Sequence, residues 1–104
     1  MNDKQRTHLR GVIKKIERSQ RLNTSPQEKA DLLQSAAAIV KAVVNELWAA
    51  RSNLPVQFQD IGPGQEILLA ADQLETASDL LAAGNYRGAR AEIAEAIKVP
   101  QRIS

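Results

Sequence analysis

The chain has 104 residues, of which 43% are hydrophobic and 25% are charged, and it contains no cysteine. A chain of this size fits one compact domain with its own core. The absence of cysteine excludes disulfides, thiolate zinc sites and cysteine nucleophiles, and it is typical of a reducing compartment, so we expect a cytoplasmic protein. No apolar run is long enough to span a membrane, and no apolar signal segment follows the charged N-terminus, so we expect no membrane association.

Charge is distributed unevenly along the chain, although the net charge is only +2. Residues 1–21 carry seven basic and two acidic side chains, which gives this segment a net charge of +5. Residues 60–83 hold five acidic side chains and neither lysine nor arginine. Because the overall charge is too small to indicate a polyanionic partner, the positions of the charges are more informative than their sum.

Residues 1–22 are predicted to form a basic amphipathic helix. Apolar side chains recur at the helical spacing i, i+3, i+4, i+7, at Leu9, Val12, Ile13 and Ile16. Five cations lie together on another face: Arg6, Arg10, Lys14, Arg18 and Arg21. This face is interpreted in three ways, as a solvated surface, as a docking surface for an acidic protein, or as a nucleic-acid contact. Gly11 lowers the stability of this helix by roughly 1 kcal/mol relative to alanine.

A central core helix is predicted over residues 25–51. Ser25 is the expected N-cap, Pro26 occupies the first helical position, and Glu28 closes a capping box. The apolar residues between positions 32 and 48 form an arc wide enough to be covered from two sides. If four helices do not cover this arc completely, a second copy would, so a homodimer is a further expectation.

Residues 52–64 are predicted to form the longest loop, because Pro55, Gly62, Pro63 and Gly64 interrupt the helical pattern. Apolar residues in rough alternation indicate an extended lid packed on the bundle, with a short strand as the alternative. Phe58 is a candidate recognition residue, since an aromatic side chain on a loop held by helices supplies binding energy. The sequence GPGQE lacks the Lys-Ser/Thr of a phosphate-binding loop and predicts a plain helix entry turn.

A helical hairpin is predicted over residues 65–100. Gly84 is the expected glycine after the first helix, Asn85 caps the second helix, and Pro100 ends it. The polar face of the first helix carries three acidic residues at helical spacing: Asp72, Glu75 and Asp79. Like charges at this spacing repel one another, so the face is either solvated or a docking surface for basic groups.

The stretch LLAAGNYRGARAEIAEAIKVP resembles the turn and second helix of a tetratricopeptide-type hairpin. Gly84, Asn85 and Tyr86 resemble the turn, and a small-large-small pattern follows at Ala89, Ile93 and Ala96. The resemblance covers about residues 67–100 and implies a helical hairpin used for protein binding. Ala77 stands where the family has a glycine, and residues 1–60 contain no second copy, so a single hairpin is expected rather than a repeat array.

No set of side chains indicates a catalytic, cofactor-binding or metal site. His8 is the only histidine, without a second ligand at a metal-binding spacing and without an evident nucleophile to activate. We therefore expect an all-α fold, a small antiparallel bundle of about four helices in a single domain over residues 1–104. The expected function is a non-enzymatic protein–protein interaction module, an adaptor, inhibitor or assembly factor that binds a larger protein. The alternative is a nucleic-acid-binding accessory protein that uses the basic N-terminal helix. The candidate partner-binding residues are Arg6, Arg10, Lys14, Arg18, Arg21, Phe58, Asp72, Glu75 and Asp79.

Overall fold

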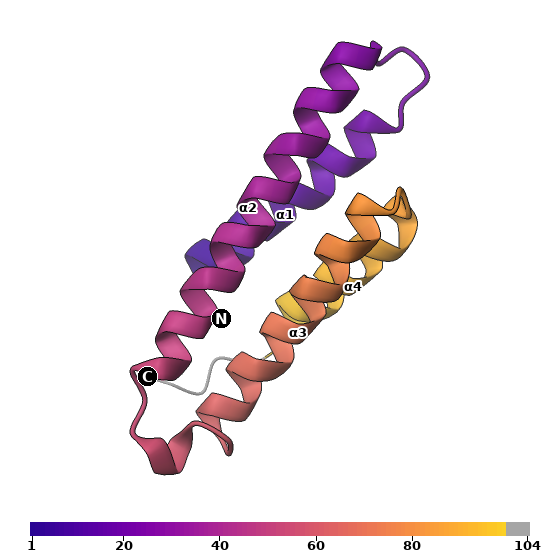
Figure 1. Cartoon of the computed structure of the whole chain (residues 1–104). Coiled ribbons are helices and arrows are strands. Elements are labelled where there is room, and N and C mark those ends of the chain that lie inside the picture. Colours follow the sequence, from indigo (N-terminus) through magenta and orange to yellow (C-terminus); the bar gives the residue numbers. More distant parts are fainter. Residues whose placement is uncertain (100–104) are drawn as a thin grey trace.

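The computed structural model describes residues 1–99, which form a bundle of four helices (Figure 1). Helix α1 spans Asp3–Ser19, α2 spans Pro26–Ser52, α3 spans Pro63–Ala82 and α4 spans Tyr86–Lys98, with a short 3-10 helix, η1, at Val56–Phe58. No strand occurs within residues 1–99, so the predicted all-α bundle is confirmed. None of the helices in this part of the chain is long and apolar enough to cross a membrane.

Successive helices run antiparallel, and α4 packs back on α1 to close the ring (Figure 1). Helices α1 and α3 therefore lie at diagonal corners of the bundle and are not direct neighbours. The body is elongated, 50 Å long and 23 × 18 Å across. Its two ends differ: the α1–α2 loop projects beyond the α3–α4 turn at one end, and the α2–α3 loop forms the other end (Figure 1).

The core is aliphatic and receives side chains from all four helices. Its largest fully buried members include Leu9 and Ile16 of α1, Leu47 of α2, Leu74 of α3 and Ile93 of α4. Alanines line the space between them and allow the helices to approach closely: Ala36, Ala70, Ala71, Ala77, Ala89 and Ala96. Each fully buried Leu or Ile contributes roughly 1.5–3 kcal/mol relative to an exposed one.

The apolar arc of α2 is covered from two sides, as predicted, by α1 and by α3. Val43 and Leu47 are buried, whereas Leu33 and Trp48 are half-buried and pack against the core. The large hydrophobic side chains that remain exposed within residues 1–99 lie outside α2. The apolar surface available to a partner is therefore found elsewhere on the molecule.

The helix ends agree with the sequence in part. Ser25 caps α2 by accepting a hydrogen bond from the Glu28 amide (3.1 Å), but the Glu28 carboxylate pairs with Arg18 of α1 at 3.0 Å. Helix α1 begins with a capping box between Asn2 and Gln5, and it ends at Ser19 rather than at position 22. The buried Ser19 hydroxyl donates to the Ile16 carbonyl at 2.6 Å, which satisfies a backbone acceptor that the last turn leaves open.

The α3–α4 turn is as predicted. Gly84 has a φ of 81°, a left-handed conformation that costs glycine little. The Asn85 amide donates to the Leu80 carbonyl (2.8 Å) and the Gly84 amide donates to Leu81 (3.1 Å), the two hydrogen bonds of a Schellman motif. The Asn85 side chain then accepts from the Gly88 amide and caps α4. Pro100, the expected end of this helix, lies outside the described residues.

The α2–α3 loop differs from the predicted extended lid. Residues Val56–Phe58 form the 3-10 turn, with the Phe58 amide donating to the Pro55 carbonyl at 2.8 Å. An extended segment without a partner strand leaves its backbone groups unpaired, whereas a tight turn satisfies some of them locally. Leu54 alone of the loop's apolar side chains packs against the core, and Val56 and Phe58 are exposed.

Candidate functional site

Exposed apolar side chains gather at one end of the bundle. Five large hydrophobic residues within positions 1–99 are exposed, and four of them come from the α2–α3 loop and the first half of α3. These four, here called the loop-end surface, are Val56 (82% exposed), Phe58 (44%), Ile61 (60%) and Leu69 (51%). Scattered apolar residues are normal on a protein surface, whereas the concentration of four of them at one end of the molecule indicates an interaction site. Phe58 is the predicted recognition residue, and the structure places it, exposed, at this end.

Arg51, at the end of α2, holds the loop in place. Its Nε donates to the Gln59 carbonyl at 2.9 Å, and one of its terminal nitrogens pairs with the Asp60 carboxylate. Its guanidinium also lies 5.8 Å from the ring centre of Trp48. Three contacts therefore fix one arginine, of which only 22% of the side chain is exposed, and through it the loop. A loop held in this way presents its apolar side chains with little ordering cost on binding.

Gly64, in the first turn of α3, lets the loop pack directly on the helix. The residue is buried, and a Cβ atom at this position would collide with the backbone carbonyl oxygens of Phe58 and Gln59. The glycine that marked a plain helix entry turn in the sequence thus determines how closely the loop approaches α3. Its position sets the spacing between Phe58 and the outward face of that helix.

A hollow of about 390 Å³ lies beside the loop-end surface on the outward face of α3. Leu68, Leu69 and Asp72 line it together with Gly62, Gln65 and Glu66. Its lining thus combines apolar side chains with carboxylates. Such a surface suits a partner that offers an apolar side chain next to a cation.

The three acidic candidates on α3 are separated by the structure. Asp72 and Asp79 are exposed, and within the described chain their carboxylates pair with no other side chain. Glu75 instead accepts a hydrogen bond from Trp48 Nε1 at 2.8 Å and joins α3 to α2. Two of the three predicted acidic residues therefore remain available to a partner, and the third has a structural role.

The basic face of α1 is likewise divided. Arg10, Lys14 and Arg21 are exposed and, within residues 1–99, form no ion pair, whereas Arg18 pairs with Glu28. Lys14, Arg18 and Arg21 line a hollow of about 510 Å³ together with Glu17. Arg21 follows the end of α1 but remains next to the other two. Three cations therefore gather near the α1–α2 loop, at the end of the molecule opposite the loop-end surface (Figure 1).

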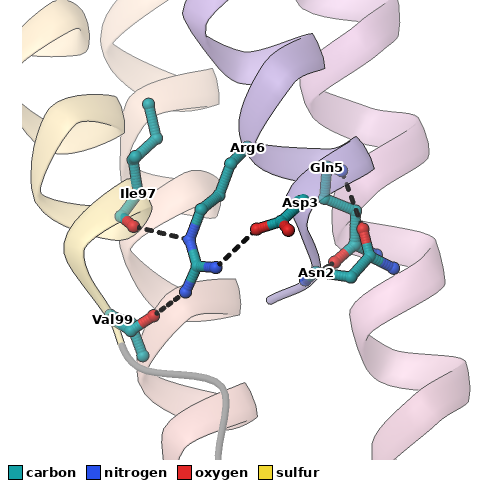
Figure 2. Close-up of polar contacts among 6 residues, drawn as sticks. All are labelled: Asn2, Asp3, Gln5, Arg6, Ile97 and Val99. Carbon is teal, nitrogen blue, oxygen red and sulfur yellow. Dashed lines mark hydrogen bonds and ion pairs between the residues drawn. The ribbon is translucent and has the colours of Figure 1, made fainter.

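Arg6 does not belong to this basic face, because it ties α1 to the end of α4. Figure 2 shows its guanidinium directed at the last carbonyls of that helix, with Nε 3.1 Å from the Ile97 oxygen and Nη2 2.9 Å from the Val99 oxygen. Asp3 pairs with the Arg6 guanidinium at 3.3 Å, and only 19% of the Arg6 side chain is exposed. A cation at a helix C-terminus satisfies carbonyls that have no intrahelical partner. Arg6 is therefore a structural residue.

The amino terminus lies against the same region. Met1 is buried, and burial lowers the pKa of its amino group below the ordinary value of 8.0. The positive charge of Arg6 lowers this pKa further, whereas the Glu66 carboxylate raises it. Charged side chains of both α1 and α3 therefore act on the amino group.

No group of three or more metal-ligating side chains occurs within the described part of the chain. His8 is exposed on α1. Sequence reasoning missed Leu69, Ile61 and Arg51 as parts of the site. Leu69 has no signal of its own, because it is one leucine among several in an apolar helix, and the role of Arg51 depends on contacts that the fold creates.

No protein-family model, curated protein or solved structure matches the chain.

Proposed function

We propose that this protein is a non-enzymatic interaction module, an adaptor, inhibitor or assembly factor, that binds a larger protein through the loop-end surface. The observation that carries the proposal is the concentration of four of the five exposed large hydrophobics of residues 1–99 on this one surface. The hydrogen bonds of Arg51 and the close approach at Gly64 add to it, because they present the surface in a fixed conformation.

The chemistry of the surface specifies the partner. Its apolar side chains and the adjacent hollow favour an apolar anchor, such as a leucine or an aromatic residue. The exposed carboxylate of Asp72, which lines the hollow, favours lysine or arginine beside that anchor, and residues 60–83 contain no cation to compete for it. We therefore propose a partner segment that combines an apolar anchor with flanking cations. The resemblance of residues 67–100 to a protein-binding hairpin is in line with this proposal, as is a cytoplasmic location for a cysteine-free chain.

A photoreactive phenylalanine analogue at position 58 tests the proposal in extracts of the cells from which the protein comes. The expected product is one crosslinked protein that is lost when Ile61→Asp or Leu69→Asp is introduced as well. Both side chains are exposed, so the substitutions are expected to leave the fold intact, and circular dichroism is the measurement that checks this. Loss of an anchor side chain of this kind is expected to weaken binding about tenfold or more.

Ala38→Asp is the matched control, because Ala38 is exposed on α2 and lies outside the loop-end surface. The Ala38→Asp protein is expected to give the same crosslink as the wild type. A crosslink that survives both Ile61→Asp and Leu69→Asp would show that the captured protein does not bind through this surface, and the proposal would be abandoned.

A further inference from the structure

The fifth exposed hydrophobic residue lies at the opposite end of the molecule from the other four. Leu22, in the α1–α2 loop, is fully exposed, at 106% of its reference area. It directly follows Arg21, which lines a hollow with Lys14, Arg18 and one carboxylate, Glu17. This end, here called the basic tip, comprises Lys14, Arg18, Arg21 and Leu22. It offers one apolar anchor with flanking cations, the chemistry that the loop-end surface favours.

The two ends complement each other in their apolar side chains and in their charges. The loop-end surface has a hollow of about 390 Å³ next to Leu69, which is ample for a leucine side chain, and the exposed carboxylate of Asp72 lines this hollow. The basic tip supplies the leucine, and its Lys14 and Arg21 form no ion pair within the described chain. Neither end can satisfy the other within one copy, because they lie at opposite ends of a body 50 Å long (Figure 1).

We propose that a second copy of this chain docks its basic tip on the loop-end surface. Leu22 of one copy enters the hollow beside Leu69 of the next, and the cations of the tip lie against Asp72. The inference rests on the proposed function, since it names one occupant of the same docking surface.

The geometry fixes the kind of assembly. The contact joins two different surfaces, so it is heterologous. In a pair of copies, one copy keeps an unused tip and the other keeps an unused loop-end surface. Association therefore continues head to tail instead of stopping at a two-fold symmetric dimer. One leucine and a few charges bury little area, so the contact is weak and depends on salt.

Sedimentation equilibrium of two complementary variants tests the proposal. Leu22→Asp removes the apolar anchor of the tip, and Leu69→Asp places a negative charge beside the hollow. Both residues are exposed, so both proteins are expected to fold like the wild type. The wild type is expected to show a mass that rises with concentration up to about 1 mM without a plateau at two copies, and that falls when salt is raised. Each variant alone is expected to remain monomeric.

A mixture of the two variants is the decisive sample. The Leu22→Asp protein keeps its loop-end surface and the Leu69→Asp protein keeps its tip, so together they are expected to form a one-to-one pair and nothing larger. Ala38→Asp serves as the control and is expected to associate like the wild type. A wild type that stays monomeric at about 1 mM in low salt, a plateau at a dimer, or a mixture without pairs would each overturn the inference.

These outcomes are independent of the test of the proposed function. If the wild type is monomeric while Leu69→Asp still abolishes the crosslink to a larger protein, the head-to-tail contact is wrong and the proposed function stands. If Leu69→Asp and Ile61→Asp leave that crosslink unchanged, the proposed function is wrong, and the inference that rests on it falls as well.

Discussion

The guanidinium of Arg51 donates to the backbone carbonyl of Gln59 across the junction between α2 and the loop that follows it. Gln59 in turn donates through its side-chain amide to the Leu54 carbonyl at 3.0 Å, so the two residues close the loop on itself. The exposed residues Phe58 and Ile61 thus belong to an ordered segment. A docking surface on a loop depends on such internal contacts, because no regular element fixes its shape.

Arg51→Met is expected to loosen this loop and to lower the free energy of unfolding by about 1–2 kcal/mol, since a partly buried carbonyl and a carboxylate lose their donor. Hydrogen exchange of the Phe58 and Gln59 amides, which donate within the 3-10 turn, is expected to become faster. Arg87→Met is the control, because Arg87 is exposed on α4. Unchanged exchange in the Arg51 variant would show that the turn is stable without the arginine.

Arg6→Met is expected to lower the free energy of unfolding by about 2 kcal/mol, because two carbonyls at the end of α4 lose a charged donor. Arg10→Met, one helical turn further along α1, changes only an exposed cation and is expected to be within about 0.5 kcal/mol of the wild type. Urea denaturation of the two variants distinguishes the roles. Equal stabilities would argue that Arg6 belongs to the solvated basic face after all.

Gly64→Ala is expected to lower the stability of the protein, since the new methyl group collides with the carbonyls of Phe58 and Gln59. Overpacking of this kind costs about 1–3 kcal/mol and displaces the loop. Thermal denaturation reports the cost, and the crosslinking yield at position 58 reports the displacement. A melting temperature equal to that of the wild type would mean that the loop can move away from α3 without a loss of stability.

Gly11→Ala is expected to have the opposite sign. Apart from the neighbouring residues and the nearby backbone of the helix itself, no heavy atom lies within 4 Å of a Cβ at this position, and the residue is in the middle of α1. Alanine lowers the backbone entropy of the unfolded chain and raises helix propensity, so the free energy of unfolding is expected to rise by about 0.5–1 kcal/mol. Destabilisation in the same denaturation assay would contradict the open space at this position.

The Met1 amino group makes stability depend on pH. Its pKa in the folded protein is lower than 8.0, so the unfolded chain binds more protons between the two pKa values. Stability therefore increases as the pH rises through this interval, and the gain is complete above about pH 8. The Arg6→Met variant removes one cause of the lowered pKa and is expected to show a shallower increase. Urea titrations of both proteins across this range measure the difference.

Local patterns predicted the helices well because each helix carries its own signals. Leu9, Val12 and Ile16 repeat with helical spacing and are all fully buried, and Asn85 caps α4 as its position after Gly84 indicated. The stop of α1 was placed three residues late, since no glycine or proline marks it, and the Ser19–Ile16 hydrogen bond is a product of burial.

The site was harder to predict than the fold because its residues act across large separations in sequence. Arg6 has the helical spacing of Arg10 and Lys14 in the sequence, and only the position of α4 shows that it binds the carbonyls of residues 97 and 99 instead. Glu75 lies three residues after Asp72, a spacing that a solvated acidic residue would have as well. Its hydrogen bond with Trp48 of α2 gives it a structural role that the spacing does not reveal. Periodicity thus identifies which residues share a helical face, whereas the packing of helices decides which of them remain available.

The bonds from Arg6 to Ile97 and Val99 also bear on the order of events during protein synthesis. The basic helix is translated before α4, and the carbonyls that hold it against α4 are made more than 90 residues later. The α1–α2 pair is connected by a short loop and can form before α4 has been synthesised, because local contacts form fastest. The ring closes only after residues 97–99 have left the ribosome. Until then the flank of α1 that meets α4 is open to nascent-chain chaperones.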